Sequence, residues 1–302
     1  WLEQSGVADP SGRVIALTAA PEKAVEWGVD ETRILPFATS VGGRYSLWSS
    51  IGFPIALAIG WEEFEAFLAG AAAVDEHFRD TEGRANLPLR AAFADLYYAR
   101  IRKAATRAVF AYDERLRLFP SYLQQLEMES NGKRVRIDGA PAGRATAPIV
   151  WGGVGTDAQH AVFQLLHQGT HLVPVEFVAA IEAGDSLAPE HHRQLLVNAF
   201  AQGAALMAGR ETGDPHRCYP GDRPSTTILM DRLDARTLGA LIAFYEHRVF
   251  ANAVLLGINP FDQFGVELGK EMAKALGGGE AIDFDPSTEA LIDRAIGEGE
   301  EG

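Results

Sequence analysis

The sequence has little cysteine and little positive charge. Its one cysteine, Cys218, cannot form an intramolecular disulfide, so a reducing, cytoplasmic setting is expected. Lysine and arginine number 27 against 41 aspartates and glutamates, which gives a formal net charge of −14. This balance argues against nucleic acid or an anionic membrane as the main partner, because both require a positive protein surface. A small anionic substrate remains possible, since it needs only a few local cations.

A long apolar run is also absent. The longest stretch without charged residues or histidine, 45–61, contains three serines, two glycines and a proline, so it is unsuited to crossing a membrane. The first residues of this sequence lack the pattern of a signal peptide, so none is expected within it. The first residue is Trp1 rather than methionine, and we therefore expect the natural N-terminus to lie upstream.

The 302 residues are 47% hydrophobic, enough for one large domain or two domains of moderate size. Short apolar runs predict strands at 13–18, 34–37, 108–112, 147–151, 171–177, 227–230 and 254–258. Longer periodic segments predict helices at 62–78, 87–103, 115–130, 156–167, 189–207, 234–250 and 260–276. This alternation favours a doubly wound α/β fold with a parallel sheet.

A change in composition near 81–89 gives the best domain boundary, because charges, Gly83 and Pro88 cluster there. We expect residues 1–85 to be the end of a first domain, since they contain too few strands for a stable sheet. Residues 86–280 contain about five strands and form the predicted second domain. The Gly- and acid-rich segment 281–302 is interpreted as a tail that becomes disordered after Ala295.

Gly42, Gly43 and Arg44 form the first candidate site, between a short predicted strand and a long apolar segment. Paired glycines allow a ligand to approach the backbone closely, and Arg44 offers a forked cation to developing negative charge. The alternative is a tight turn with a solvated arginine.

Gln125 and Glu129 form the second candidate site, four residues apart on one edge of a predicted helix. Asn131-Gly132 is a helix-stop signal, which puts Glu129 in the final turn. There the helix dipole opposes carboxylate charge, as suits a general base working near neutral pH. The alternative is an ordinary surface glutamate.

The glycine-rich segment 151–160 has two functional interpretations. Gly153-x-Gly155-x-x-Ala158 follows an apolar strand, and Glu176 stands near the end of the next predicted strand. Together they resemble a dinucleotide fingerprint with its ribose-binding acid, although in the middle of a domain. The competing interpretation centres on His160 in the first helical turn, where the dipole favours an uncharged imidazole.

The fourth candidate site extends from Asn259 to Lys270. Asn259 is a predicted N-cap and Pro260 fits the first helical position. Gln263 and Lys270 are seven residues apart and hence on one face, with Gln263 in the first turn. A helix N-terminus, an amide and a lysine together suit an oxygen-rich anionic ligand, the alternative being a lone surface lysine.

Taken in order, these segments resemble the phosphoglucose isomerase family. The two signature segments are Val41-Gly-Gly-Arg-Tyr-Ser-Leu-Trp-Ser49 and Phe261-Asp-Gln-Phe-Gly-Val-Glu-Leu-Gly-Lys270. Further matching segments are Met128-Glu-Ser-Asn-Gly-Lys133, Gly155-Thr-Asp-Ala-Gln-His160, His167-Gln-Gly-Thr170, Gly221-Asp-Arg-Pro224 and Gly239-Ala-Leu-Ile-Ala-Phe-Tyr-Glu-His247. The resemblance therefore extends over almost the whole chain.

The resemblance implies a sugar-isomerase (SIS) fold, a three-layer α/β/α sandwich with a five-stranded parallel sheet. It implies one complete domain of this kind, preceded by the tail of another. The implied activity is reversible aldose–ketose isomerisation of glucose 6-phosphate to fructose 6-phosphate, in glycolysis and gluconeogenesis, through a cis-enediol(ate). Neither metal nor other cofactor is implied, and the implied assembly is a homodimer.

The resemblance also assigns roles to single residues. Glu129 matches the base that moves a proton between C2 and C1, and Arg44 matches the arginine that stabilises the negative intermediate. His160 matches the ring-opening histidine, contributed by the partner subunit, and Lys270 matches the lysine at the ring oxygen. The implied substrate-binding residues are Gln125, Gln263 and Gly43.

Two departures from the family pattern concern the glycine-rich loop and the start of the chain. The family usually has Glu, Pro, Asn and Gly where this chain has Gly153, Val154, Asp157 and Ala158. The family's Ser/Thr-rich phosphate loop would lie upstream of Trp1, so most of the phosphate-binding part of the site is expected to be missing from this chain, which can be inactive alone. A non-catalytic sugar-phosphate-binding module and an NAD-dependent oxidoreductase remain as alternative functions.

Overall fold

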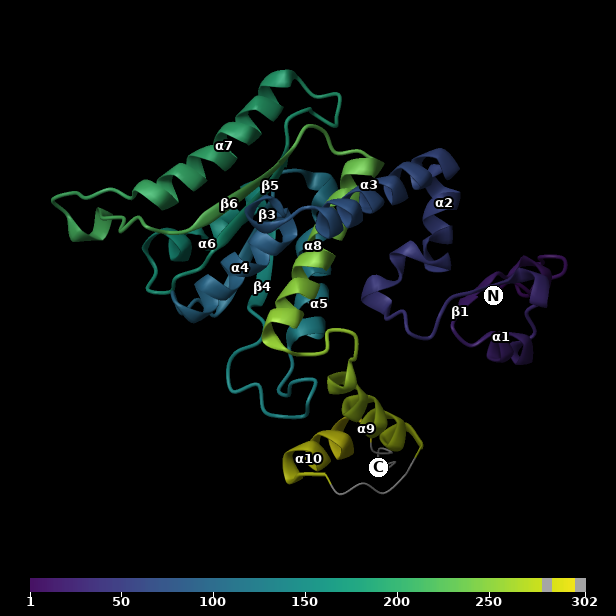
Figure 1. Cartoon of the computed structure of the whole chain (residues 1–302). Helices are drawn as coiled ribbons and strands as arrows, with labels where there is room; N and C mark the ends of the chain where they lie inside the picture. Colours follow the sequence, from purple (N-terminus) through teal and green to yellow (C-terminus); the bar gives the residue numbers. More distant parts are fainter. Residues whose placement is uncertain (279–283, 297–302) are drawn as a thin grey trace. The chain divides into compact units, whose positions relative to one another are not determined.

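The computed structural model describes residues 1–278 and 284–296, in two compact units (Figure 1). The first unit comprises Trp1–Phe261 and the second Asp262–Gly302. The domain limits expected from composition, 1–85, 86–280 and 281–302, stay a prediction.

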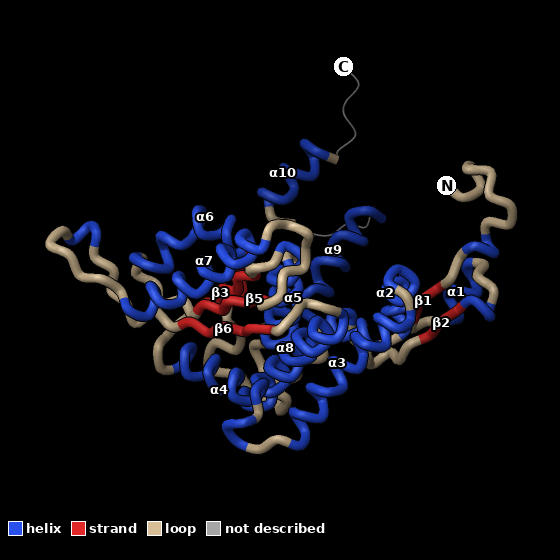
Figure 2. Tube along the Cα trace, turned by 90° about the horizontal axis from the view of Figure 1, so that it is seen from above, coloured by secondary structure: helices blue, strands red, loops and turns tan. Residues whose placement is uncertain are grey.

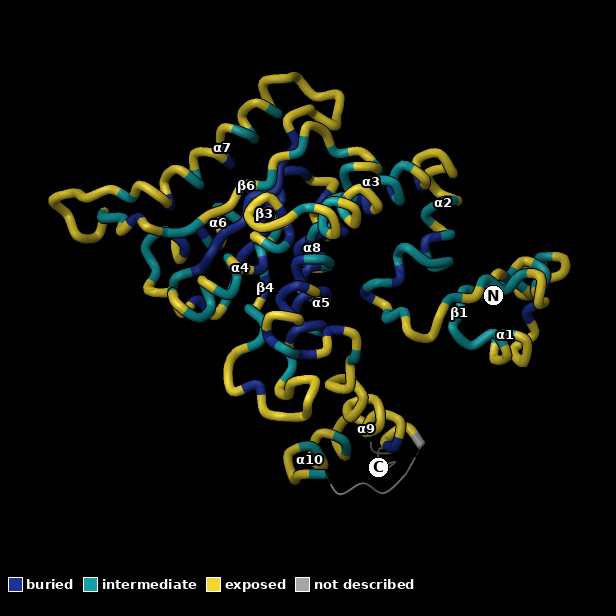
Figure 3. The backbone as a smooth tube through the Cα atoms, viewed as in Figure 1, coloured by how far each residue is buried: buried dark blue, intermediate teal, exposed yellow. Residues whose placement is uncertain are grey.

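A four-stranded parallel sheet forms the centre of the first unit. Its order is β4 (Ile149–Val154), β3 (Thr106–Ala111), β5 (Val175–Ala180) and β6 (Ser225–Met230). Every residue of β5 is buried, as expected of a strand covered on both faces (Figure 3). The α/β architecture with a parallel sheet is therefore confirmed.

Helices cover both faces of this sheet and complete the three layers. Helices α6 (Gly155–Gln168) and α7 (Pro189–Ala208) lie on one face. Helices α4 (Leu87–Arg100), α5 (Phe119–Asn131) and α8 (Ala235–Leu256) lie on the other (Figure 2). Successive side chains of β3 point to opposite faces of the sheet and so belong to two separate hydrophobic cores. Val109 and Ala111 face α5 and α8, whereas Ala108 and Phe110 face α6 and α7.

Helix α3 (Trp61–Asp80) crosses α8 on the side away from the sheet, and glycines make this contact close. A Cβ on Gly70 would meet the carbonyl oxygen of Arg236, and a Cβ on Gly239 would lie 2.0 Å from that of Phe67. Backbone therefore packs directly on backbone, which a larger residue at either position would prevent.

The first hundred residues contain only one short pair of parallel strands, β1 (Ala16–Thr18) and β2 (Ile34–Pro36). The helices α1 (Pro21–Trp27) and α2 (Phe53–Ile59) accompany them. The second unit contains α9 (Glu267–Gly278) and α10 (Pro286–Ala295). Short 3-10 turns occur at η1 (Ser11–Arg13), η2 (Glu31–Arg33), η3 (Gly43–Trp48), η4 (Ser50–Gly52), η5 (Gly83–Ala85), η6 (Glu114–Leu116), η7 (Pro215–Arg217) and η8 (Phe264–Val266).

The expected strand at 254–258 is wrong, and the central sheet of the described chain has four strands rather than five. The apolar run belongs to the last turn of α8, which ends at Leu256. Gly257 terminates the helix in a left-handed conformation with a φ of 70°, and its N–H bonds back to Ala253. A short apolar run fits a buried helix end as well as a buried strand, and only packing decides.

The expected helix at 260–276 begins later, at Glu267. Asn259 does not cap it, because its Oδ1 accepts from the N–H of Phe261 in a local turn (3.0 Å). The 3-10 turn Phe264–Val266 intervenes, so the expectation that Gln263 lies in the first helical turn is wrong. Of the tail expected to be disordered after Ala295, residues 297–302 lie outside the described residues.

None of the helices in the described chain combines the length and apolarity needed to cross a bilayer.

Candidate active site

Arg44 lies near the start of η3, and its side chain is only 1% exposed. Its Nε donates to Ser130 Oγ at 2.7 Å, and its Nη2 donates to the carbonyl of Pro260. The guanidinium also lies over the ring of Tyr45, 5.4 Å from the ring centroid. Beside it, a Cβ on Gly43 would meet no described atom within 4 Å, so the space next to this glycine is open.

Glu129 stands in the last turn of α5, as the Asn131-Gly132 stop signal predicts. Its Oε1 lies 3.4 Å from Arg44 Nη1, and Gln125 Nε2 donates to its Oε2 at 3.0 Å. The Glu129 side chain is 23% exposed, so an external molecule can reach it. The structure therefore brings together three of the candidate residues, Arg44, Glu129 and Gln125.

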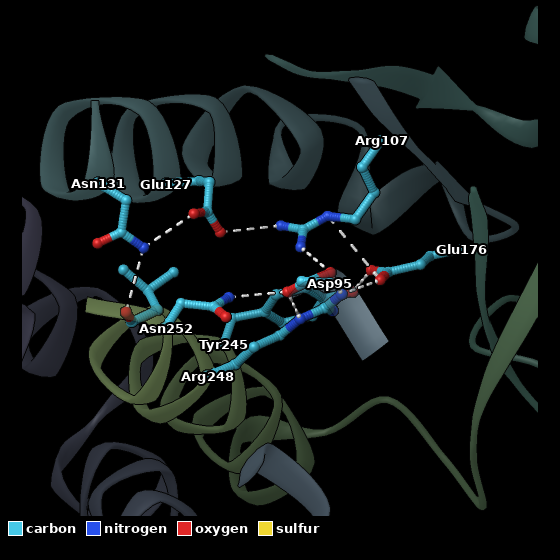
Figure 4. A network of polar contacts seen from close by, with 9 residues as sticks. Asp95, Arg107, Glu127, Asn131, Glu176, Tyr245, Arg248 and Asn252 are labelled. Carbon is cyan, nitrogen blue, oxygen red and sulfur yellow. Dashed lines mark hydrogen bonds and ion pairs between the residues drawn. The ribbon is translucent and has the colours of Figure 1, made fainter. Parts of the chain in front are cut away.

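A buried network of charged and polar side chains contacts the C-terminal end of α5 (Figure 4). Arg107 of β3 donates to Asp95 of α4 at 2.9 Å and to Glu127 of α5 at 3.2 Å. Asn131 donates to the other oxygen of Glu127 (2.9 Å) and to the carbonyl of Val249 on α8 (3.1 Å). The turn that carries Glu129 is thus tied to the sheet and to α8.

Arg248 of α8 forms the second cationic centre of this network. It contacts Asp95 through two nitrogens, and its Nη2 lies 2.6 Å from Glu176 of β5. Tyr245 OH donates to the other oxygen of Glu176 at 2.7 Å, and Asn252 donates to Asp95 at 2.9 Å. All of these groups are buried or nearly so, so each charge is neutralised within the protein rather than by water.

Burial and charge pairing act in opposite directions on the three acids. Burial raises the pKa of Glu127, and the attraction of Arg107 does not overcome it. Burial also opposes the charges of Asp95 and Glu176, but the two arginines outweigh burial and hold both pKa values below the usual range.

Sequence reasoning missed most of this network. Four of the other five residues of β3 are fully buried. A charged residue within such an apolar strand was the one signal in the sequence that could have indicated a buried ion pair at Arg107. Asp95, Arg248 and Glu127 lie among ordinary helical charges. Their partners are brought to them only by the fold.

The placement of Glu176 removes the main support for a dinucleotide site. The expected strand at 171–177 would have put Glu176 near its carboxyl end, where a ribose-binding acid belongs. The strand instead begins at Val175, so Glu176 is its second residue, at the amino edge, and is engaged by Arg248 and Tyr245. That expectation was wrong because the strand lies later in the sequence.

His160 is exposed on α6, on the opposite face of the sheet from α5. Helix α6 starts directly after β4, so His160 lies toward the carboxyl edge. Helix α5 runs back across the sheet, and its last turn, with Glu129, lies toward the amino edge. Within one chain, His160 and Glu129 are therefore not brought together.

Gln263 and Lys270 belong to the second unit. Gln263 immediately precedes the 3-10 turn Phe264–Val266, and Lys270 lies exposed in the first turn of α9. The described residues include no cluster of three or more His, Cys, Asp or Glu side chains placed to hold a metal ion.

Glu246 of α8 is a further acid that sequence reasoning missed. Trp48 Nε1 donates to its Oε2 at 2.8 Å, and Tyr122 OH donates to its Oε1 at 3.3 Å. Burial is the main cause that raises its pKa to about 7, and nearby Asp75 adds to the effect.

We predict that Glu246 makes folding stability depend on pH. Below pH 4.5 the carboxyl is protonated in both the folded and the unfolded chain. Between 4.5 and 7 only the unfolded chain releases the proton, so stability falls as the pH rises. Glu246→Gln should therefore stabilise the full-length protein by about 3 kcal/mol at pH 8 and by almost nothing below pH 4.5. Urea unfolding across this pH range measures the difference.

Glu65→Gln, which changes an exposed acid on α3, is the control and should give the same small difference at every pH. A stability gain for Glu246→Gln that is equally large at both ends of the range would contradict the assignment.

Comparisons with a family model and with curated proteins indicate the same family. The family model described as phosphoglucose isomerase matches residues 1–292. The chain is 74% identical over 297 residues to a glucose-6-phosphate isomerase of Rhizorhabdus wittichii. The aligned region covers 98% of this chain and 59% of that protein. It is 71% identical over 299 residues to a protein of the same name from Erythrobacter litoralis, with 98% and 58% covered.

A solved structure shares the fold. The crystal structure of a glucose-6-phosphate isomerase from Chlamydia trachomatis aligns with a TM-score of 0.86 at 36% identity, over 95% of this chain and 56% of that chain. The chain thus spans somewhat less than three fifths of the length of the curated relatives and of this structure. By the match over nearly its whole length, together with the α/β sandwich described above, the chain belongs to the phosphoglucose isomerase family.

Proposed function

We propose that the full-length protein interconverts glucose 6-phosphate and fructose 6-phosphate, with Glu129 as the base. The observation that carries this proposal is the contact between Arg44 and Glu129, a base and a cation 3.4 Å apart in a site open to small molecules. The three relatives described above are named glucose-6-phosphate isomerases, which supports the same reaction.

In this proposal Glu129 takes the proton from C2 of the open-chain aldose. The electron pair released moves into the C1–C2 bond, and the C1 carbonyl oxygen acquires negative charge. Arg44 stabilises the resulting cis-enediolate, because its buried guanidinium is already oriented before the charge develops. The hydroxyl proton of O2 then passes to O1, the proton held by Glu129 returns to C1, and O2 becomes the carbonyl oxygen, which completes the ketose. Gln125 orients the carboxylate of Glu129.

The remaining site residues are assigned by the family match. Gly43 leaves room for the sugar beside Arg44, Gln263 binds the ligand, and Lys270 acts at the ring oxygen. His160 opens the ring from the partner subunit of a homodimer. This supply from a partner is favoured because His160 and Glu129 of one chain lie on opposite faces of the sheet. The single cysteine favours a cytoplasmic enzyme.

The direct test is an assay of the full-length protein with glucose 6-phosphate, followed by NMR of the sugar carbons. We expect fructose 6-phosphate to form with a kcat on the order of 10–10³ s⁻¹. Saturable binding of the sugar phosphate with no turnover would instead identify a binding module.

Subunit exchange tests the role of His160. Glu129→Gln and His160→Ala homodimers should each be nearly inactive. In a mixed dimer one of the two sites receives both an intact Glu129 and an intact His160, so about a quarter of wild-type activity should return once random exchange is complete, in line with the two-fold symmetry of such dimers.

Mixing Glu129→Gln with Glu129→Ala is the control, because no arrangement of these subunits rebuilds a site. Activity that stays at the level of this control after complete exchange would exclude supply of His160 from the partner.

A further inference from the structure

Glu246 carries a partly buried carboxyl for which the proposed reaction has no use. It projects from α8 between η3 and α5, and borders a cavity of about 390 Å³ lined mainly by aromatic rings. Trp48 of η3 and Tyr122 of α5 both donate to it. A side chain that joins these two elements through one carboxyl group is placed to control their separation.

The same two elements carry the reacting groups. Arg44 is the second residue of η3 and Trp48 is its last, and Tyr122 precedes Glu129 by seven residues, on the same side of α5. The two elements also touch directly, since both Arg44 Nε and Tyr45 OH contact Ser130 Oγ, at 2.7 and 2.9 Å. The loop of Arg44 is thus held to α5 at one end by Ser130 and at the other through Glu246.

We propose that Glu246 is a positioning residue, which fixes η3 against α5 and thereby sets Arg44 relative to Glu129. This inference rests on the proposed isomerase function. The stabilisation that a fixed cation gives to developing charge falls steeply when the cation moves, and a displacement of 1 Å can cost about 100-fold in rate. Without Glu246, Trp48 keeps its stacking on Phe67 (4.9 Å between centroids) but loses its polar anchor.

Glu246 can hold both partners in either protonation state. The carboxylate accepts from Trp48 and Tyr122 together, whereas the neutral acid accepts from Trp48 and donates to the Tyr122 oxygen. Besides Tyr122, the titratable groups that line the same cavity are Tyr45 of η3, Asp75 of α3 and His247 of α8, and the last two pair with each other at 2.6 Å. Glutamine reproduces the contacts of the neutral acid, so it is the conservative replacement.

The test compares Glu246→Ala with Glu246→Gln in the full-length protein, with glucose 6-phosphate as the substrate. We expect Glu246→Ala to lower kcat by about 10- to 100-fold with little change in KM, because Arg44 acts mainly on the intermediate. Glu246→Gln should retain most of the activity. With substrate deuterated at C2, Glu246→Ala should show a larger isotope effect on kcat than wild type, because proton transfer becomes slower than the other steps.

The isotope effect separates positioning from simple loss of folded protein. A smaller folded fraction lowers the apparent kcat but leaves the isotope effect unchanged. Trp48→Phe, which removes the indole N–H and keeps an aromatic ring, should change kcat and the isotope effect in the same direction. It should add little in a Glu246→Ala background, since both changes break the same link. Trp61→Phe, at the far end of the same row of rings, is the control and should leave both quantities near wild type.

The outcomes separate the two proposals. If the wild-type protein does not isomerise the sugar phosphate, the proposed function fails. If the wild type is active and Glu246→Ala matches it in kcat and isotope effect, only the positioning role is overturned. A lower kcat with an unchanged isotope effect would also overturn it.

Discussion

Glu129→Gln should lower kcat for isomerisation by about 10²- to 10⁴-fold, the range that a positioned general base contributes. Glutamine preserves the shape of the side chain and an oxygen to accept from Gln125 Nε2, which now lies 3.0 Å from the carboxylate. It cannot take the proton from C2. We therefore expect the KM of the full-length variant to stay within a few-fold of the wild-type value while turnover collapses.

Exchange of the C2 proton with D₂O, followed by NMR, measures the affected step directly and should slow in parallel with kcat. Glu190→Gln, an exposed acid in the first turn of α7, changes the net charge equally and should leave both rates unchanged. A Glu129→Gln enzyme that exchanges the proton at the wild-type rate would remove Glu129 from the role of base.

The pairing of Gln125 with Glu129 could be predicted from the sequence, because four residues in one helix fix their distance. The proximity of Arg44 could not, since it depends on the packing of η3 on α5 through Ser130, 86 positions away. For His160 the helix was predicted correctly. Its separation from Glu129 follows instead from which face of the sheet each crossover covers, a tertiary property.

The errors also have physical causes. An apolar run such as 254–258 suits a buried helix end and a buried strand equally, and contact with α4 and its partners favours the helix. The start of α9 was displaced because Asn259 and Pro260 have the chemistry of a cap but form a turn. In both cases the local sequence pattern has the expected chemistry, but tertiary packing places it in a different element: a helix end for 254–258 and a turn for Asn259 and Pro260.

Arg107→Met should destabilise the full-length protein by about 3–5 kcal/mol, the cost of leaving buried carboxylates without their partner. Arg107 contacts Asp95 and Glu127 directly, and its Nε lies 3.9 Å from Glu176, so one substitution affects three acids. Arg248 alone cannot balance them. Methionine fills a similar volume, and the loss therefore reports charge rather than a cavity.

The matched control is Arg102→Met, which breaks an arginine–aspartate pair with Asp222 at 2.7 Å. That pair is exposed, with 83% of the Asp222 side chain accessible, so its loss should cost far less stability than the loss of Arg107. Urea unfolding of both variants gives the comparison. Equal losses would mean that the buried network contributes no more than a surface pair.

A second substitution identifies which charge causes the loss. Burial already disfavours the ionised form of Glu127, whereas Asp95 and Glu176 are held ionised by the two arginines. Glu127→Gln added to Arg107→Met should therefore recover only part of the stability, because Asp95 still faces a reduced positive charge. Since Glu127 also anchors Asn131 in the turn beside Glu129, the double variant should regain stability more fully than isomerase activity. Parallel recovery of both would mean that the network supports the fold without shaping the site.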